Sequence, residues 1–333
     1  MDSGATAAQE QAKRLHEKLE RELGETVVAA LADPKVVEIM LNADGYLWLD
    51  VLGEGMRSTG VGMSAMQAEN LLRTVASALE AVANAEHPIL EGVLPIDGSR
   101  FAGILPPVSN RPVFAIRKRA SLIFSLDDYV ASGVCTASQA DALRRAVSQR
   151  ENILIVGSTG SGKTTLANAV LREISAQHPE QRVVIIEDTV ELQCGAPNHV
   201  ALKTSDGVDM TRLLRTTMRL RPDRIVVGEV RGAEALALLK AWNTGHPGGV
   251  ATVHANGALA GLVRLEQLIG EANVPPQPQL IAEAVDLIVS IARTPAGRRL
   301  QEIVRVTGYS PSSGYDGTTI DSKVVALERT TAA

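Results

Sequence analysis

The chain has 333 residues, of which 45% are hydrophobic, and its formal net charge is -5 at pH 7. This length and hydrophobic content predict one large or two ordinary globular domains, and they exclude a disordered chain or a miniature scaffold. The negative net charge and the aromatic content of 3% do not favour a protein that binds nucleic acid mainly by electrostatics. We therefore expect no direct sequence-specific nucleic-acid binding.

The cysteines and the lack of a long apolar run indicate where the protein works. Cys135 and Cys194 fit neither a metal-ligand spacing nor a disulfide framework, which is typical of a reducing cytoplasm. No apolar run approaches the roughly 18 residues of a membrane helix, and the polar N-terminus is unlike a signal peptide. We expect a cytoplasmic protein whose membrane association is peripheral and made through partners.

Residues 1–118 predict a small α+β domain. Apolar residues recur at helical spacing from Leu15 to Leu31, and we expect this stripe to cover the chain's own sheet rather than to dock on a partner. Two apolar runs over 36–51 flank an Ala-Asp-Gly turn and predict a β-hairpin. A helix from the N-cap Ser64 to Leu79 and three short strands near 92–95, 99–107 and 111–118 complete the domain.

Residues 119–133 have weak periodicity, and we expect them to link the first domain to a second one over 134–309. In the second domain, apolar strands alternate with helices, which predicts a mostly parallel sheet of the α/β class with helices on both faces. The strands are expected at 152–156, 183–187, 225–229, 250–254, 287–292 and 300–306. We expect residues 310–333 to form a loop-like tail with one edge strand over 323–327.

The string GSTGSGKT at 157–164 fits the phosphate-loop pattern G-x-x-x-x-G-K-[ST], and it lies between an apolar strand and a helix, as that motif requires. Its glycines allow successive backbone N–H groups to point at phosphate oxygens beside the positive end of the helix. Lys163 would reach the β- and γ-phosphates, and Thr164 would hold Mg²⁺. The expected nucleotide-binding residues are Gly157, Ser158, Thr159, Gly160, Ser161, Gly162, Lys163, Thr164 and Thr165.

Acidic residues follow two other predicted strands. Glu229 ends an apolar strand, where a carboxylate can orient or deprotonate the attacking water. Gly228 stands where an aspartate usually holds the water shell of the metal. The cluster Glu187, Asp188 and Glu191 follows an earlier strand, and it either supplies the metal-side carboxylates or caps a helix.

Histidines and arginines supply further candidates. His246 and His254 lie in a Gly-rich stretch, where each is either a sensor of the γ-phosphate or a satisfied structural residue. Two groups of arginines could complete a neighbouring subunit's phosphate site or form surface salt bridges. They are Arg215, Arg219 and Arg221, and Arg100, Arg111 and Arg117.

Taken in order, these motifs resemble the secretion ATPase superfamily, whose ring-forming members power secretion, pilus extension and retraction, and conjugation. The phosphate loop, the acidic box EDTVE at 187–191, the strand ending in Gly228 and Glu229, and VHAN at 253–256 follow the family order. The segments IMLNADGYLWLD, GSRFAGILPPVSNRPVFAIRKR and LRPDRIVVGEVRGAEAL look like the TrbB type, the conjugal-transfer branch of the type IV secretion ATPases. The chain lacks the four-cysteine metal module of the type II relatives.

The resemblance implies a RecA-like P-loop NTPase domain with a smaller N-terminal α+β domain, assembled as a hexameric ring that uses ATP and Mg²⁺. It implies that Glu229 is the catalytic carboxylate and that His254 senses the γ-phosphate. It places Glu187 and Glu191 in the acidic box near the metal and water, with Glu187 and Thr164 as metal contacts. Arg100 and Arg117 fall where related proteins clamp nucleotide or contact a neighbour.

The leading interpretation is an ATP-hydrolysing motor of a conjugative type IV secretion apparatus, held at the inner face of the cytoplasmic membrane by inner-membrane components. A type IV pilus extension or retraction motor is the nearest alternative. A DNA-translocating RecA-like ATPase is a second alternative, which would need a basic or aromatic surface for the strand. A third is a docking ring that binds nucleotide without useful turnover.

Overall fold

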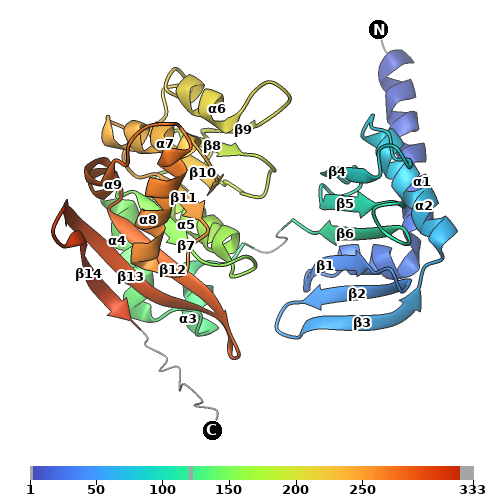
Figure 1. The fold of residues 1–333 in the computed structure, drawn as a ribbon, viewed down its shortest axis with the longest axis horizontal. Coiled ribbons are helices and arrows are strands. Elements are labelled where there is room, and N and C mark those ends of the chain that lie inside the picture. The colour runs from blue at the N-terminus through green and yellow to red at the C-terminus, as the bar shows by residue number, and fades with distance from the viewer. Residues whose placement is uncertain (1–2, 120–122, 323–333) are drawn as a thin grey trace. The chain divides into compact units, whose positions relative to one another are not determined.

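The computed structural model describes residues 3–119 and 123–322, and the chain divides into two units, residues 1–122 and 123–333 (Figure 1). Each unit has its own β-sheet and its own hydrophobic core. Within the described residues, no helix is both long and apolar enough to span a bilayer.

The first unit is an antiparallel sheet with two helices on one of its faces (Figure 1). The spatial strand order is β3-β2-β1-β6-β5-β4. The elements are α1 (Ser3–Ala32), β1 (Val36–Leu41), β2 (Tyr46–Val51), β3 (Gly55–Gly62), α2 (Ala65–Ala78), β4 (Ile89–Val93), β5 (Arg100–Ile104) and β6 (Val113–Arg117).

The apolar stripe of α1 covers this sheet, as its spacing predicts. Leu19, Leu23 and Val27 are buried in one core with residues of α2 and of the strands. Ser64 caps α2 through a capping box, because its hydroxyl accepts from the N–H of Gln67 while the Gln67 side chain accepts from the N–H of Ser64. The predicted hairpin and both helices are confirmed, whereas β3 adds a strand that the sequence pattern did not predict.

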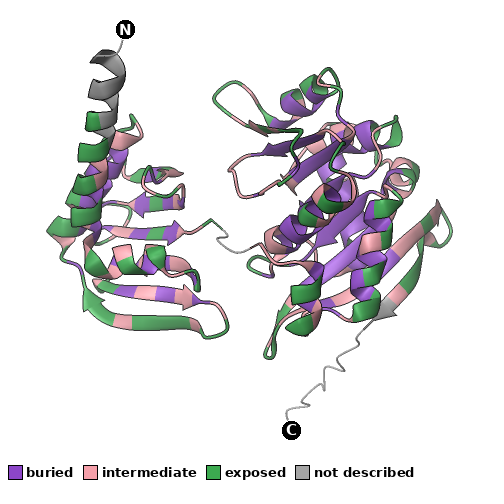
Figure 2. Ribbon diagram, turned by 180° about the vertical axis from the view of Figure 1, so that it is seen from behind, coloured by how far each residue is buried: buried purple, intermediate pink, exposed green. Residues whose placement is uncertain are grey.

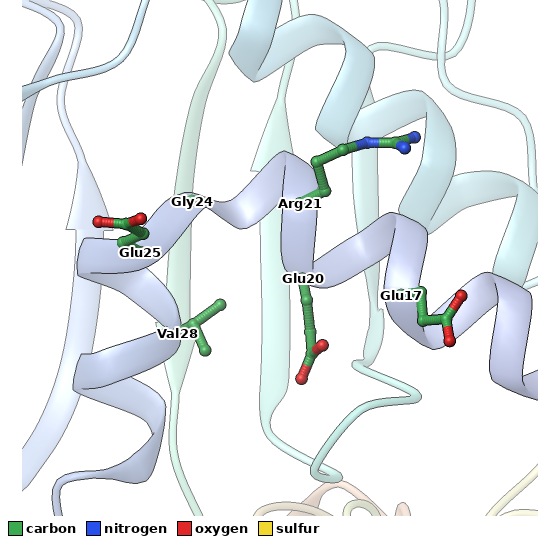
Figure 3. Close-up of a pocket in the computed structure, with 6 residues that line it drawn as sticks. All are labelled: Glu17, Glu20, Arg21, Gly24, Glu25 and Val28. Carbon is green, nitrogen blue, oxygen red and sulfur yellow. The ribbon is translucent and has the colours of Figure 1, made fainter.

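The helix α1 is kinked at Gly24, whose φ of 78° lies outside the helical region. A shallow hollow lies along this kink, and Figure 3 shows side chains of both signs around it. Its lining is Glu17, Glu20, Arg21, Gly24, Glu25 and Val28. These residues include no nucleophile, and their charges of both signs favour no single ligand.

The second unit is built on an eight-stranded sheet with spatial order β14-β13-β12-β7-β11-β10-β8-β9. The six strands from β12 to β9 are parallel, and β13 and β14 extend the sheet as an antiparallel ribbon. Its strands are β7 (Ile153–Val156), β8 (Val183–Glu187), β9 (His199–Lys203), β10 (Arg224–Val230), β11 (Val250–Val253), β12 (Leu287–Thr294), β13 (Gly297–Ser310) and β14 (Gly314–Ser322).

Helices cover both faces of this sheet, which confirms the predicted α/β class, and the central strands are buried throughout (Figure 2). One core lies under α3 (Leu126–Ala131), α4 (Ala137–Ser148) and α5 (Lys163–Gln177). The other lies under α6 (Met210–Thr217), α7 (Glu234–Asn243), α8 (Ala258–Gly270) and α9 (Pro278–Ala284). Short apolar strands in a two-sided core explain why their sequence pattern is a continuous apolar run.

Two expectations about the second unit need correction. The segment expected to be a linker over 119–133 contains α3, whose Leu126 and Tyr129 are buried in the core beside α4 and α5. The expected loop-like tail from 310 contains β14, which pairs with β13 from Glu302 to Ser310. Backbone pairing with β13 stabilises β14 although four of its nine residues are Gly or Asp, which are rare in strands. The edge strand expected over 323–327 lies outside the described residues.

Candidate functional site

Four sequence motifs end on four neighbouring strands of the second sheet. The phosphate loop follows β7, His254 follows β11, Glu229 is near the end of β10, and Glu187 ends β8. These strands are adjacent in the order β7-β11-β10-β8 and run parallel. All four motifs therefore lie along the carboxyl edge of the sheet, where α/β folds bind their ligands.

The phosphate loop turns sharply between β7 and α5. Gly160 and Gly162 have φ values of 70° and 103°, which glycine adopts without strain. A Cβ on Gly157 would lie 2.3 Å from the carbonyl oxygen of Ile291, so only glycine fits there. Gly162 has no side chain with which to cap α5, and the N-terminus of a helix favours an anion.

Lys163 is 7% exposed, and its ammonium group lies within the loop. It donates to the carbonyl oxygens of Gly157 and Ser158, each at 3.1 Å. The same Nζ lies 3.2 Å from Nδ1 of His254. Because an ammonium can only donate, Nδ1 is the acceptor, and the His254 proton resides on Nε2.

Glu229 is connected to the phosphate loop through this histidine. Nε2 of His254 lies 2.6 Å from Oε1 of Glu229. Burial lowers the pKa of His254, and the neighbouring Lys163 ammonium lowers it further, against the opposing effect of Glu229. A neutral imidazole therefore lies between the Lys163 ammonium and the Glu229 carboxylate.

Glu187 is buried, at 4% exposure, and its carboxylate is held by the backbone of the acidic box. Oε1 accepts from the N–H groups of Glu191 and Leu192, each at 2.9 Å. A Cβ on Gly228 would lie 2.8 Å from Cγ of Glu187, so the glutamate side chain occupies the space beside that glycine. This explains physically why an aspartate is not found at 228.

Glu191 is the acidic-box residue that reaches the phosphate loop. Its Oε2 accepts from the hydroxyl of Thr164 at 3.2 Å. The buried Asn168 of α5 holds the same segment, because its amide contacts the carbonyl oxygen of Glu191 and accepts from the N–H of Gln193. Thr164 and Glu191 bring two oxygen donors together, which suits Mg²⁺. Glu187, which the resemblance implies as a metal contact beside Thr164, uses its Oε1 to hold the backbone of this segment.

Two arginines that the motif analysis did not single out also lie at this edge. Arg231 binds Oε2 of Glu229 through Nε at 2.8 Å and also through Nη2. Arg298 lies at the start of β13, and its Nε donates to the carbonyl oxygen of Gly160 at 3.3 Å. The sequence signal for Arg231 is its place two residues after Glu229, whereas Arg298 shows no local signal.

Three further candidates are Arg100 and Arg117 of the first unit and His246 of the second. Arg100 and Arg117 are cross-strand partners on β5 and β6 of the first unit, and Arg117 lies 3.6 Å from Glu38. Phe101 and Ile116 beside them are buried under the helices, so the two arginines are on the helix-free face of that sheet. His246 lies 3.0 Å from the carbonyl oxygen of Pro222, which is a structural role.

Fold and site together define a RecA-like P-loop domain joined to a smaller α+β domain. Comparison with known proteins agrees with this class and narrows it. The family model described as "Type II/IV secretion system protein" matches residues 59–319. The chain belongs to that family.

Among the relatives, "Probable conjugal transfer protein TrbB" of Sinorhizobium fredii is 57% identical over 297 residues, covering 89% of this chain and 91% of its own. "Conjugal transfer protein TrbB" of Rhizobium radiobacter is 56% identical over 296 residues, with the same coverage. The solved structure of the Legionella pneumophila ATPase DotB has a TM-score of 0.61 at 20% identity, covering 83% of this chain and 78% of that chain. That structural likeness supports the fold.

Proposed function

We propose that the protein is an ATP-hydrolysing motor that works as a homo-hexamer and energises assembly or substrate transfer in a conjugative type IV secretion system. The family, and relatives above 55% identity that are named for conjugal transfer, support the choice of system. The observation that carries the activity is the contact chain from Lys163 through His254 to Glu229. It links the group that binds phosphate to the group that activates water.

The binding step uses the phosphate loop. Lys163 turns from the loop carbonyls to the β- and γ-phosphates, and the N–H groups of the first turn of α5 donate to phosphate oxygens. Thr164 and Glu191 would hold Mg²⁺, which would neutralise phosphate charge. Glu187 keeps the acidic box in place through its bonds to the N–H groups of Glu191 and Leu192.

Hydrolysis uses Glu229. Once Lys163 binds phosphate, it gives up its contact with Nδ1 of His254, and the imidazole becomes able to respond to the γ-phosphate. Glu229 takes one proton from a water whose oxygen attacks the γ-phosphorus. The bond from that phosphorus to the bridging oxygen breaks, and ADP leaves with the electron pair.

Steady-state hydrolysis by purified full-length protein tests the activity. Glu229→Gln keeps the size of the side chain and removes the base, so turnover falls roughly 100-fold while nucleotide binding persists. Glu283→Gln, an exposed glutamate of α9, is the matched control and keeps full turnover. Equal turnover in Glu229→Gln and wild type would overturn the assignment of the base.

Plasmid transfer to recipient cells tests the choice of system. Lys163→Ala replaces the native protein, protein levels are matched, and twitching motility is scored beside transfer. Transfer collapses and motility persists if the motor serves conjugation. Intact transfer with lost motility would instead identify a pilus motor. Intact transfer with Glu229→Gln in the cell would indicate a docking ring.

A further inference from the structure

Among the described residues, only Oε2 of the Glu229 carboxylate accepts a hydrogen bond, while the buried Oε1 has His254 as a close neighbour. His254 contacts Oε1 at 2.6 Å, and the guanidinium of Arg231 binds Oε2 through two nitrogens, one of them at 2.8 Å. A single contact would leave the carboxylate free to rotate about its last torsion. The two nitrogens of Arg231 fix Oε2, and His254 lies between Oε1 and the Lys163 ammonium of the phosphate loop.

Arg231 is itself anchored at both ends. Its backbone N–H donates to Oε1 of Glu234 at 2.6 Å, and that oxygen also accepts from the N–H of Gly232. At the far end, Nη1 lies 3.9 Å from Oδ2 of Asp188, whose Oδ1 accepts from the hydroxyl of Thr204. Asp188, the second residue of the acidic box, therefore contacts the arginine, whereas Glu191 contacts the phosphate loop.

We infer that Arg231 is a positioning residue for hydrolysis, which fixes Oε2 of Glu229 so that Oε1 addresses the attacking water, and that Asp188 orients Arg231. This inference rests on the proposed function. An arginine suits the role because its planar fork binds a carboxylate at two points, whereas lysine offers a point charge. The guanidinium side chain is 53% exposed beside a surface hollow, so it is held by its contacts rather than by packing.

The residues that Arg231 contacts are different from those proposed to bind phosphate. The contacts of Arg231 are with Glu229, Asp188 and Glu234, while phosphate binding belongs to the loop before α5. Loss of Arg231 should therefore lower kcat and leave nucleotide affinity unchanged. A residue that merely supports the fold would alter both, or would lower stability.

The test is a double-mutant cycle read by single-turnover ATP hydrolysis, nucleotide affinity and thermal unfolding. Arg231→Ala, Arg231→Lys and Asp188→Asn are each made in wild type and in Glu229→Gln. In wild type, Arg231→Ala lowers the rate about tenfold, Arg231→Lys recovers part of it, and Asp188→Asn costs less. Nucleotide affinity stays within about twofold. In Glu229→Gln, Arg231→Ala costs nothing further, because it acts through the carboxylate.

Arg73→Ala is the matched control, since Arg73 also pairs with a glutamate, at 2.7 Å, on an exposed helix face of the first unit. Its rate should equal that of wild type. The inference is overturned if Arg231→Ala keeps the wild-type rate, or if it costs the same in both backgrounds. Failure of the proposed function gives a different result, in which wild type itself does not hydrolyse ATP or Glu229→Gln matches it.

Discussion

Two buried cationic side chains lie at opposite ends of the parallel strands of the second sheet. Lys163 follows the carboxyl end of β7, and Arg224 begins β10, which runs parallel to β7 through β11. Arg224 is fully buried, and its guanidinium donates to Gln181 Oε1, Gly248 O and Val147 O at 2.6, 3.0 and 2.9 Å. Lys163 contacts carbonyls of its own loop and the ring of His254.

The two cations differ in the segments from which their hydrogen-bond acceptors come. The acceptors of Arg224 come from α4, from the loop before β8 and from the loop before β11, so this cation joins three segments permanently. Burial lowers the pKa of Arg224 to about 10, with the nearby Arg150 charge adding to the effect, and it stays protonated at neutral pH. The partners of Lys163 belong to a loop shaped for an anion. Arg224 therefore stabilises the fold, whereas Lys163 binds the nucleotide in the function that we propose.

Lys163→Ala should weaken nucleotide binding and leave the stability of the second unit almost unchanged. Nucleotide affinity falls by roughly 100-fold or more, because the phosphate charge loses its main compensating group. The stability of the second unit changes little, since the loop carbonyls of Gly157 and Ser158 become accessible to water. Calorimetric titration with ATP measures affinity, and thermal unfolding measures stability. Lys203→Ala, an exposed lysine of β9, is the control with wild-type affinity.

Arg224→Met should have the opposite outcome. Three acceptors lose their donor inside the protein, which costs roughly 3–5 kcal/mol of stability. Urea unfolding followed by Trp242 fluorescence reports on the second unit when Trp48 of the first unit is replaced by phenylalanine, because the chain has two tryptophans. Affinity per folded molecule stays at the wild-type value. A stable Arg224→Met protein with impaired affinity would mean that the two cations are not separate in role.

The motif residues of the candidate site could be predicted from the sequence, but the buried residues that hold the surrounding segments in place could not. The four motifs follow strands that are continuous apolar runs, so their common sheet edge could be foreseen from β7, β8, β10 and β11. The supporting residues could not be foreseen, because a buried Arg224 or Asn168 has the same sequence appearance as an exposed one. Only the tertiary contacts distinguish them.

Secondary structure was foreseen where the period was regular and missed where elements were short or atypical. The helices α3 and α9 have six and seven residues, too few for a 3.6-residue period to be seen. The strand β14 contains two glycines and two aspartates among its nine residues, Gly314, Asp316, Gly317 and Asp321, and its pairing with β13 overrides their weak β-propensity.

Gly228→Ala should disturb Glu187 and so lower both stability and the rate of hydrolysis. The new Cβ would lie 2.8 Å from Cγ of Glu187 and would displace a side chain that holds the backbone of Glu191 and Leu192. We expect about 1–3 kcal/mol of lost stability and a roughly tenfold slower hydrolysis. Gly270→Ala is the control, because nothing lies within 4 Å of the Cβ at that last residue of α8. Wild-type hydrolysis by Gly228→Ala would contradict the role given to Glu187.

The smallest effect concerns the charge that Lys163 places on His254. Burial and that ammonium lower the pKa of His254 below the usual value of about 6.5, so the folded protein favours the neutral ring. The resulting stability is fully present above about pH 6.5, where the ring is neutral in both states, and is lost as the pH falls through the lowered pKa. His254→Gln should lack this acid-side loss.

An NMR titration of the His254 ring tests whether the Lys163 ammonium lowers the pKa of that histidine. In Lys163→Ala the lowering due to the ammonium disappears, so the pKa of His254 rises toward its usual value while the part due to burial remains. Nucleotide should also raise it, because Lys163 turns away and phosphate charge arrives. ATP affinity should then increase as the pH falls through the window between the two values, and more in wild type than in His254→Gln. An unchanged His254 titration in Lys163→Ala would show that the contact at 3.2 Å carries no electrostatic coupling.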